Sequence, residues 1–304
     1  MSINGINSIN GIKNNTLNNE SKGCLYVVST PIGNMDDITI RALKILEKVD
    51  IIATEDTRST ARMLSYHNIK GKLVSCHEYN ESERAIGLIK KIYDGETIAL
   101  VSEAGTPSIS DPGYRLVNEA IANNIKVIPV PGPSAVITAL SVSGLPTDSF
   151  IFIGFLPKKK SKRNNVLKRL VREKGTIVFY ESPKRIIKLL EEIKNIFGDR
   201  YGVLSREMTK KYEEFIRGKL SEIQVILEAK TIVKGEFTIL ISGCGDEEIK
   251  LSDKELHLEI IERLSVKGTK PSRLARDLAG ETGLPRKIVY EEILKISDNK
   301  KNNN

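Results

Sequence analysis

The 304-residue sequence has few of the residues that build metal sites or disulfide frameworks. It contains three cysteines, three histidines, no C-x-x-C pair and no H-x-x-x-H pair. Because Cys24, Cys76 and Cys244 lie far apart, we expect no disulfide, no zinc site and no other bound metal. An isolated cysteine is more often a small buried hydrophobic side chain, and free thiols are typical of the cytoplasm, which is the compartment we expect.

Segments that direct a chain to a membrane are also missing. No apolar run approaches the roughly 18–20 residues that span a bilayer. The first 22 residues have neither a basic start nor an apolar stretch, so they do not form a secretory signal. Seven of the first twenty residues are Asn. A segment of this kind cannot bury enough apolar surface to offset chain entropy, so residues 1–22 are predicted to be a disordered tail.

Two nucleotide-binding fingerprints are absent as well. There is no G-x-G-x-x-G after the first predicted strand and no G-x-x-x-x-G-K-[ST] anywhere in the chain. Their absence argues against the ordinary NAD-binding folds and against P-loop NTPases.

What the sequence does contain is a regular alternation of apolar runs with helical patterns. Strands are expected at 25–29, 51–54, 73–76, 97–102 and 127–130, and helices at 38–48, 59–66, 81–93, 114–122 and 134–142. The strands are nearly all apolar, which is typical of strands covered on both faces. We therefore predict an α/β domain at 23–145 with a mostly parallel sheet.

A second α/β domain is expected at 146–246, after a helix break at Gly144-Leu145-Pro146. Its predicted strands are 150–155, 176–180, 202–205 and 237–241, and its predicted helices are 164–172, 184–196 and 221–229. Beyond an acidic spacer at 246–248, residues 252–297 contain no strand-like run. They are predicted to form three short helices (254–265, 271–279 and 286–296) of the helix-turn-helix type, followed by a frayed tail at 298–304.

Positive charge is concentrated in one segment. The net charge of the whole chain is +8, and the segment from Lys158 to Lys174 alone has nine basic residues and one acidic residue. A local basic block on an otherwise balanced protein favours contact with a polyanion, because each neutralised phosphate releases counterions. A solvated lysine-rich loop is the alternative interpretation.

Three loops that follow predicted strands are rich in Gly and Pro. They are residues 30–34, 103–113 and 131–134. Open α/β sheets bind ligands at the carboxyl ends of their strands, and small residues let the main chain approach a ligand closely. Structural alternatives exist: Asp111-Pro112 has the form of a helix N-cap followed by proline at the first helical position, which we expect it to be. Residues 131–134 could be a simple strand-to-helix turn.

Taken together, the motifs have a specific order. It runs TPIGN at 30–34, EDTR at 55–58, the loop at 103–113, PGPS at 131–134, GFLP at 154–157 and FYES at 179–182. Over about residues 25–243 this series closely resembles the tetrapyrrole (corrin/porphyrin) methylase superfamily, and in particular its members that methylate a ribose 2′-hydroxyl of ribosomal RNA. The helical segment at the end is similar to the helix-turn-helix that closes those proteins.

The resemblance implies two α/β domains with S-adenosylmethionine bound between them, and a homodimer. The implied substrate is a cytidine in the decoding region of 16S rRNA, within the RNA or the 30S particle. Relatives have Gly-Asp-Pro where this chain has Gly105-Thr106-Pro107, so the contact at Thr106 would lack a charge. The residues implied to line the cofactor are Pro31, Gly33, Glu103, Gly105, Thr106, Ile109, Pro131, Gly132, Ser134 and Thr238.

Methyl transfer to a hydroxyl needs alignment of donor and acceptor and benefits from a general base. Among the carboxylates near the implied cleft we rank Glu181 and Glu55 first, because both stand at predicted strand ends. Ion pairing with Arg185 or Arg58 is the alternative role for each. The residues expected to hold RNA phosphates are Lys158, Lys159, Lys160, Lys162, Arg163, Arg206 and Lys210.

Two other functions fit the same fold. One is a corrin or porphyrin methyltransferase, for which the basic block and the helical end would have no use. The other is a non-catalytic RNA-binding assembly factor, against which the intact Gly- and Pro-rich loops argue.

Overall fold

The computed structural model describes residues 23–245, 253–264, 270–282 and 284–302. The chain divides into two compact units between Ser134 and Ala135. The tail predicted at 1–22 and the acidic spacer at 246–248 lie outside the described residues. Within the described part of the chain, no helix combines the length and the apolar character that a membrane span requires.

The first unit contains a five-stranded sheet. Its strands are β1 (Leu25–Val28), β2 (Ile51–Thr54), β3 (Leu73–Ser75), β4 (Ile98–Val101) and β5 (Val127–Val130), in the order β3-β2-β4-β1-β5. Every neighbouring pair is parallel, as the sequence predicts. In this order β1 lies between β4 and β5, so the loops that follow these three strands leave the sheet next to one another.

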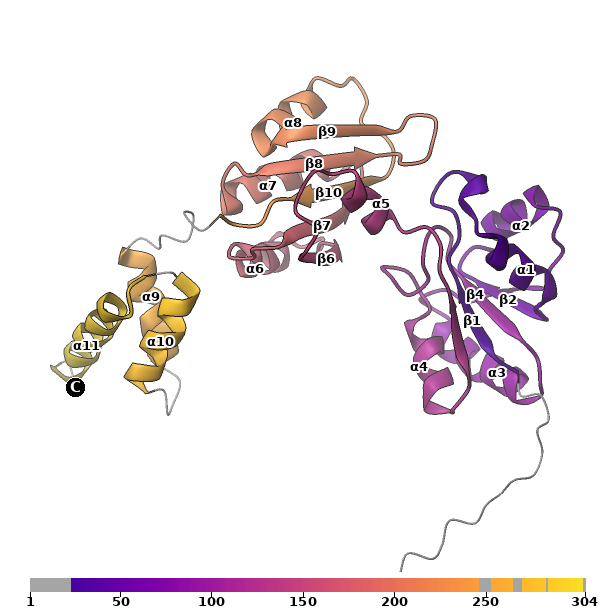
Figure 1. Ribbon diagram of the computed structural model, residues 1–304, viewed down its shortest axis with the longest axis horizontal. Helices are drawn as coiled ribbons and strands as arrows, with labels where there is room; N and C mark the ends of the chain where they lie inside the picture. Colours follow the sequence, from indigo (N-terminus) through magenta and orange to yellow (C-terminus); the bar gives the residue numbers. More distant parts are fainter. Residues whose placement is uncertain (1–22, 246–252, 265–269, 283, 303–304) are drawn as a thin grey trace, which may run out of the picture. The chain divides into compact units, whose positions relative to one another are not determined.

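Helices cover both faces of this sheet, as Figure 1 shows. The helices α1 (Ile40–Lys48) and α2 (Thr57–Tyr66) pack on one face, after a short 3-10 turn, η1 (Met35–Asp37). On the other face lie α3 (Glu81–Tyr93) and α4 (Tyr114–Ala122). Adjacent strand residues such as Ile51 and Ile52 enter different cores. Because both faces of the strands are buried, the strand sequences are unbroken apolar runs.

The N-terminus of α4 corrects one expectation. We predicted Asp111 as its cap, but the helix begins at Tyr114, after Gly113 turns the chain at a φ of 129°. The donors are instead satisfied by the buried carboxylate of Glu81 at the start of α3. Its Oε1 accepts from the backbone N–H groups of Gly113 (3.0 Å), Arg115 (2.7 Å) and Leu116 (3.2 Å). Because Asp111 precedes the turn, it is not the N-cap of this helix.

The second unit has a mixed sheet in the order β6-β7-β10-β8-β9. The strands are β6 (Phe150–Phe155), β7 (Thr176–Glu181), β8 (Tyr201–Arg206), β9 (Glu214–Lys219) and β10 (Phe237–Ile241). Only β6 and β7 pair in parallel, and the other neighbours are antiparallel. Helices α6 (Lys160–Leu170), α7 (Ile186–Phe197) and α8 (Leu220–Glu228) share one core with the sheet, in which Leu167, Leu190 and Leu220 are fully buried.

Two details of this unit differ from the sequence-based expectation. The helix α5 (Ala135–Ser141) contacts β10 and belongs to the second unit, whereas we placed the domain boundary between residues 145 and 146. Strand β9 was not predicted at all. It is an edge strand in which Ile216 and Gly218 are buried while Arg217 and Lys219 are exposed, so its sequence has almost no apolar pattern.

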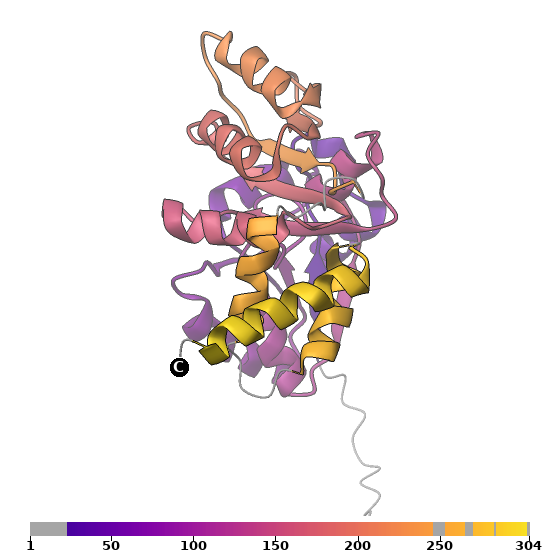
Figure 2. The ribbon, with the colours of Figure 1, turned by 90° about the vertical axis from the view of Figure 1, so that its left-hand side faces the viewer.

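Three further helices form a core of their own. They are α9 (Asp253–Leu264), α10 (Pro271–Thr282) and α11 (Arg286–Asn302), and Ile260, Leu278 and Ile293 are fully buried among them. Figure 2 shows α11 crossing the other two. The number of helices is as expected, but α11 continues to Asn302, past the predicted end at 296 and into the predicted frayed tail. No Gly or Pro occurs at 297–302 to stop it.

Candidate functional site

The loops after β1 and β4 are joined by main-chain hydrogen bonds. The N–H of Thr30 donates to the carbonyl of Gly105 (2.9 Å), and the N–H of Gly105 donates back to the carbonyl of Thr30 (3.1 Å). The hydroxyl of Thr30 also donates to the carbonyl of Ser102 at 3.2 Å. Gly105 has a φ of 85°, a conformation that side chains rarely adopt, so this approach of two loops depends on glycine.

The loop after β5, residues 131–134, is joined to the other two loops through Thr106 and Gly132. The Thr106 Oγ1 lies 3.0 Å from Ser29 Oγ and donates to the carbonyl of Pro133 at 3.3 Å. At Gly132, a Cβ would lie 2.9 Å from the Cβ of Ser29, so only glycine allows this packing. The hydroxyl of Thr106 thus joins the β1 and β5 loops to the β4 loop.

Nine of the ten residues implied to line the cofactor belong to these three loops. Several present surface at the sheet edge: Gly33, Glu103, Ile109, Pro131 and Gly132 are exposed, whereas Pro31 and Gly105 are buried. The tenth, Thr238, lies on β10 in the second unit, where it is 4% exposed and its carbonyl accepts a hydrogen bond from Ser205 Oγ at 3.0 Å.

Carboxylates gather at the same edge of the first sheet. Burial, and next the negative charge of Glu103, raise the pKa of Glu55 above its usual range. Burial, and next the charge of Glu55, raise the pKa of Asp111 to about 7. No sequence pattern indicates this second shift, because Asp111 resembles an ordinary helix cap. A carboxyl group that titrates near neutral pH is suited to accept a proton in catalysis.

Glu55 also lines a hollow in the surface of the first unit. The hollow has a volume of about 430 Å³ and is lined by Glu55, Asp56, Thr57, Arg58, His77, Glu78 and Tyr79. Asp56 caps α2 by accepting from the N–H groups of Arg58 (2.7 Å) and Ser59 (3.3 Å), and these bonds lower its pKa. Among the described residues, no ion pair joins Glu55 to Arg58. Glu55 is therefore the carboxylate of this hollow that keeps a raised proton affinity.

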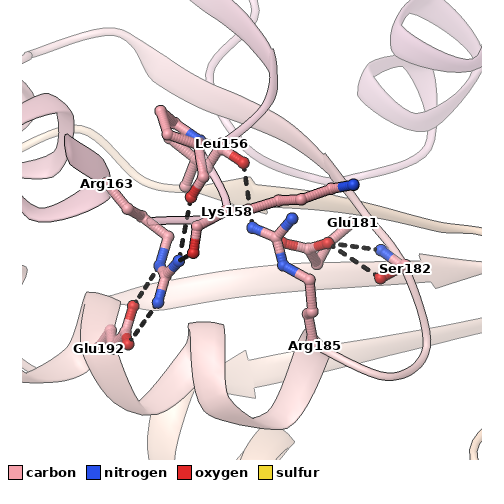
Figure 3. A network of polar contacts seen from close by, with 8 residues as sticks. Leu156, Lys158, Arg163, Glu181, Ser182, Arg185 and Glu192 are labelled. Atoms are coloured by element: carbon pink, nitrogen blue, oxygen red, sulfur yellow. Dashed lines mark hydrogen bonds and ion pairs between the residues drawn. The ribbon is translucent and has the colours of Figure 1, made fainter. Parts of the chain in front are cut away.

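Glu181, the other proposed base, lies in the second unit at the end of β7. It is 2% exposed, and its Oε2 lies 3.1 Å from Nη2 of Arg185. Its Oε1 accepts from the N–H of Ser182 (2.7 Å) and from the Ser182 hydroxyl (3.2 Å). Figure 3 shows this enclosure, in which Arg185 also donates to the carbonyl of Leu156 at 3.0 Å. The ion pair with Arg185, the alternative role considered for Glu181, is present.

Arg163 differs from the lysines of the basic block because its side chain is buried. It is 6% exposed, and its guanidinium binds Glu192 in a two-point ion pair, with Nη2 2.7 Å from Oε1. Its Nη1 donates to the carbonyls of Pro157 (3.0 Å) and Lys158 (2.8 Å). Figure 3 shows Arg163 between Glu192 and Lys158. These partners satisfy its charge and fix the start of α6, so it is not presented to a phosphate.

The other proposed RNA-contacting residues fall into two groups. Arg206 is paired with Glu214, and Lys210 is paired with Glu207 and Glu236. In contrast, the side chains around the start of α6 are exposed: Lys158, Lys159, Lys160 and Lys162. These four lysines supply the exposed positive charge at the start of the basic block, and Lys168, Arg169 and Lys174 are exposed farther along it.

The comparisons with known proteins agree with one another. Residues 24–224 match the family described as tetrapyrrole (corrin/porphyrin) methylases. A protein of Halalkalibacterium halodurans, named ribosomal RNA small subunit methyltransferase I, is 43% identical over 277 residues, which cover 89% of this chain and 94% of the relative. The protein of the same name from Escherichia coli O157:H7 is 41% identical over 278 residues, covering 90% and 96%.

Solved structures resemble the chain in fold. A cobalt precorrin-4 methyltransferase matches with a TM-score of 0.55 and 20% identity, covering 72% of this chain and 94% of the other. A uroporphyrin-III C-methyltransferase from Thermus thermophilus, complexed with S-adenyl homocysteine, matches with a TM-score of 0.53 and 18% identity, covering 72% and 97%.

Proposed function

The chain belongs to the tetrapyrrole methylase family, and within it to the ribosomal RNA small subunit methyltransferase I proteins. From this membership we propose that the protein methylates the ribose 2′-hydroxyl of a cytidine in small-subunit rRNA. The methyl donor we propose is S-adenosylmethionine. The observation that carries the proposal is the likeness to proteins of that name over nearly the full length of both chains. The decoding region of 16S rRNA, within the 30S particle, is the proposed target.

The three joined loops of the first unit fit such a donor. S-adenosylmethionine presents an adenine, ribose hydroxyls and an amino acid end, all of which main-chain N–H and C=O groups can bind. We propose that residues of these loops hold it: Pro31, Gly33, Glu103, Gly105, Ile109, Pro131, Gly132 and Ser134. Thr106 shapes the site, since its hydroxyl already engages Ser29 and Pro133. When bound, the donor supplies an activated methyl group.

The protein's own chemistry concerns the proton of the acceptor hydroxyl. We propose Glu55 as the general base, because it lines an open hollow and its raised pKa increases its affinity for a proton. Glu181 is the other proposed base, but its enclosure by Ser182 and Arg185 favours a positioning role. Through Arg185 it would hold the loop that precedes α6.

Methyl transfer from labelled S-adenosylmethionine to small subunits of a strain that lacks this protein tests the function. Digestion of the RNA should yield labelled 2′-O-methylcytidine. Label on a base, or on uroporphyrinogen-type substrates in place of RNA, would contradict the proposal. A purified protein that fails to bind S-adenosylmethionine, with or without the particles, would support the non-catalytic interpretation.

Substitution of the two carboxylates separates their roles. Glu55→Gln should lower the single-turnover rate by about 10²–10⁴-fold, since it removes the base, and should leave the Kd for S-adenosylmethionine near the wild-type value. Glu181→Gln should act mainly on the KM for the RNA particle. Glu47→Gln, on the exposed face of α1, is the matched control. An unchanged rate in Glu55→Gln would exclude Glu55 as the base.

We further propose that the protein acts in the cytoplasm as a homodimer. The compartment follows from the proposed substrate, and the dimer from the resemblance to the family. Light scattering on the purified protein would give about twice the chain mass of 33.8 kDa if the dimer forms.

A further inference from the structure

Three aromatic rings form a row across β6 and β7. The ring centroid of Tyr180 lies 4.9 Å from that of Phe152 and 5.6 Å from that of Phe155. Phe155 pairs with Tyr180 in the strand register and is 57% exposed, so it is the open end of the row. Phe179, the neighbour of Tyr180, points to the opposite face and into the helix-covered core.

A β-bulge places these rings together. Side chains alternate between the two faces of a strand, so residues three apart, such as Phe152 and Phe155, would ordinarily point in opposite directions. The register of β6 against β7 shifts between Phe152 and Gly154, and Gly154 has a φ of 72°. The extra residue of the bulge brings Phe155 to the same side as Tyr180. Bulges often re-aim a side chain next to a functional site.

The loop that follows Phe155 is held by two guanidinium groups. Arg185 donates to the carbonyl of Leu156, and Arg163 donates to the carbonyls of Pro157 and Lys158. Each arginine is itself fixed by a buried carboxylate, Glu181 or Glu192 (Figure 3). This loop is therefore pre-organised, and it presents Phe155 and the lysines in a defined position.

The surface beside the exposed ring is positively charged. Lys158, Lys159, Lys160 and Lys162 are exposed, and residues 155–162 contain no acidic side chain. A single exposed hydrophobic side chain is ordinary. An exposed ring that is supported by a second ring and adjoins a run of exposed cations has the composition of single-stranded nucleic-acid sites, where bases stack on aromatics and cations contact phosphates.

We propose that Phe155, supported by Tyr180, is a base-stacking site for an unpaired nucleobase of the RNA, with the neighbouring lysines on the flanking phosphates. The inference rests on the proposed function, which supplies RNA as the substrate. Bases within a duplex are stacked on each other and offer no free face, so the site selects single-stranded or locally opened RNA.

Fluorescence of 2-aminopurine tests the stacking directly. The probe is a single-stranded 12-nucleotide RNA with 2-aminopurine at successive positions, and the same strand in a duplex is its comparison. Wild-type protein should quench the fluorescence at one or two positions of the single strand. Phe155→Leu should abolish the quenching and weaken binding by about 5- to 100-fold, whereas Phe155→Trp should preserve both. Thermal melts of the full-length variants show that each is folded.

The salt dependence of binding separates the ring from the lysines. Phe155→Leu should leave the slope of log K against log salt unchanged, because the ring has no charge. Lys158→Gln with Lys160→Gln should reduce the slope by about 0.7 for each phosphate that these lysines neutralise in the wild type. Tyr212→Leu is the matched control: Tyr212 is 64% exposed and lies beside Lys211, but it has no supporting ring partner among the described residues. Its affinity should not change.

Three outcomes would each overturn the stacking site. Phe155→Leu could bind RNA with the wild-type affinity, Phe155→Leu and Tyr212→Leu could weaken binding equally, or the wild type could fail to quench the fluorescence. Methyl transfer by the wild type distinguishes this failure from failure of the proposed function. If the wild type methylates small subunits while Phe155→Leu binds and reacts as well as it does, only the stacking inference is wrong. If the wild type does not methylate them, the proposed function itself is wrong.

Discussion

Two aspartates near the same sheet edge illustrate how surroundings decide the behaviour of a residue. Asp56 accepts two backbone hydrogen bonds at the start of α2, and these bonds lower its pKa. Asp111 follows β4, where burial and the charge of Glu55 raise its pKa to about 7. The same side chain is therefore a fixed anion in one place and a group that changes its protonation state near neutral pH in the other.

The raised pKa of Asp111 predicts a pH-dependent stability. Below about pH 4 the carboxyl is protonated in both the folded and the unfolded chain. Between its unfolded pKa of 3.8 and its folded pKa of about 7, only the unfolded chain ionises, so stability falls as the pH rises through this window. Asp111→Asn should thus be more stable than wild type above pH 8, by on the order of 3 kcal/mol after a discount for solvent screening of the partly exposed carboxyl. Urea unfolding across pH 4–9 measures the difference, and a constant difference would contradict the assignment.

The ion pair between Arg163 and Glu192 makes a second residue-scale prediction. Removing one partner leaves the other charge buried and unpaired, which typically costs about 3–5 kcal/mol. Glu192→Gln should therefore lower the free energy of unfolding by an amount of that order. Glu191→Gln, on the exposed side of the same helix, should change it by less than about 0.5 kcal/mol. Equal effects of the two substitutions would mean that the buried pair does not stabilise the fold.

We treated the basic block as one exposed surface and therefore did not predict that Arg163 is buried. A signal was available in the helical spacing. Arg163, Leu167 and Leu170 follow one another at intervals of four and three residues, which places the arginine on the apolar face of α6. Lys162 lies on another face of the helix, whereas Lys158, Lys159 and Lys160 stand before the helix or at its first residue, and all four lysines are exposed.

At the scale of elements, α4 depends on a cap that comes from another helix. Glu81→Ala would leave three backbone N–H groups at the start of α4 without this acceptor, because the Glu81 carboxylate accepts from Gly113, Arg115 and Leu116. The expected loss of stability is about 2 kcal/mol. Chemical unfolding of Glu81→Ala against the exposed Glu83→Ala checks it. Similar midpoints for the two variants would show that water replaces the cap without cost.

Elements with two buried faces were predicted well, and elements with a weak pattern were not. The strands of the first sheet begin and end within one or two residues of the prediction, since each is a short apolar run between turns. Strand β9 has only Phe215 and Ile216 as an apolar pair, and its partner β8 determines its conformation. The cap of α4 also depends on a residue about thirty positions away, which no local motif reveals.

At the scale of the whole molecule, the chain has separate hydrophobic cores. Among the described residues, the buried members of the core of α9, α10 and α11 all belong to those helices. A chain that ends at residue 245 should therefore keep the Tm of the two α/β units within about 3 °C, which corresponds to roughly 1 kcal/mol. Differential scanning calorimetry of this shortened chain beside the full one measures it. A much larger fall would mean that the helices stabilise the rest of the protein.

The overall organisation could be inferred from the order of motifs, but the position of the boundary between the units could not. Gly144-Leu145-Pro146 is the strongest break in the sequence, yet the units divide before α5, because α5 packs against β10. That contact joins residues about a hundred positions apart. Likewise, the loops of the candidate site are separate motifs in the sequence and become one site only through the strand order of the first sheet.

The place of β10 has a consequence for synthesis on the ribosome. It is the last strand of its sheet in sequence order, yet it lies in the middle of that sheet, between β7 and β8. Until residue 241 has left the exit tunnel, the nascent second unit has two open strand edges and no central strand to join them. The growing polypeptide is thus exposed to aggregation through these edges from the emergence of β7 until β10 closes the gap.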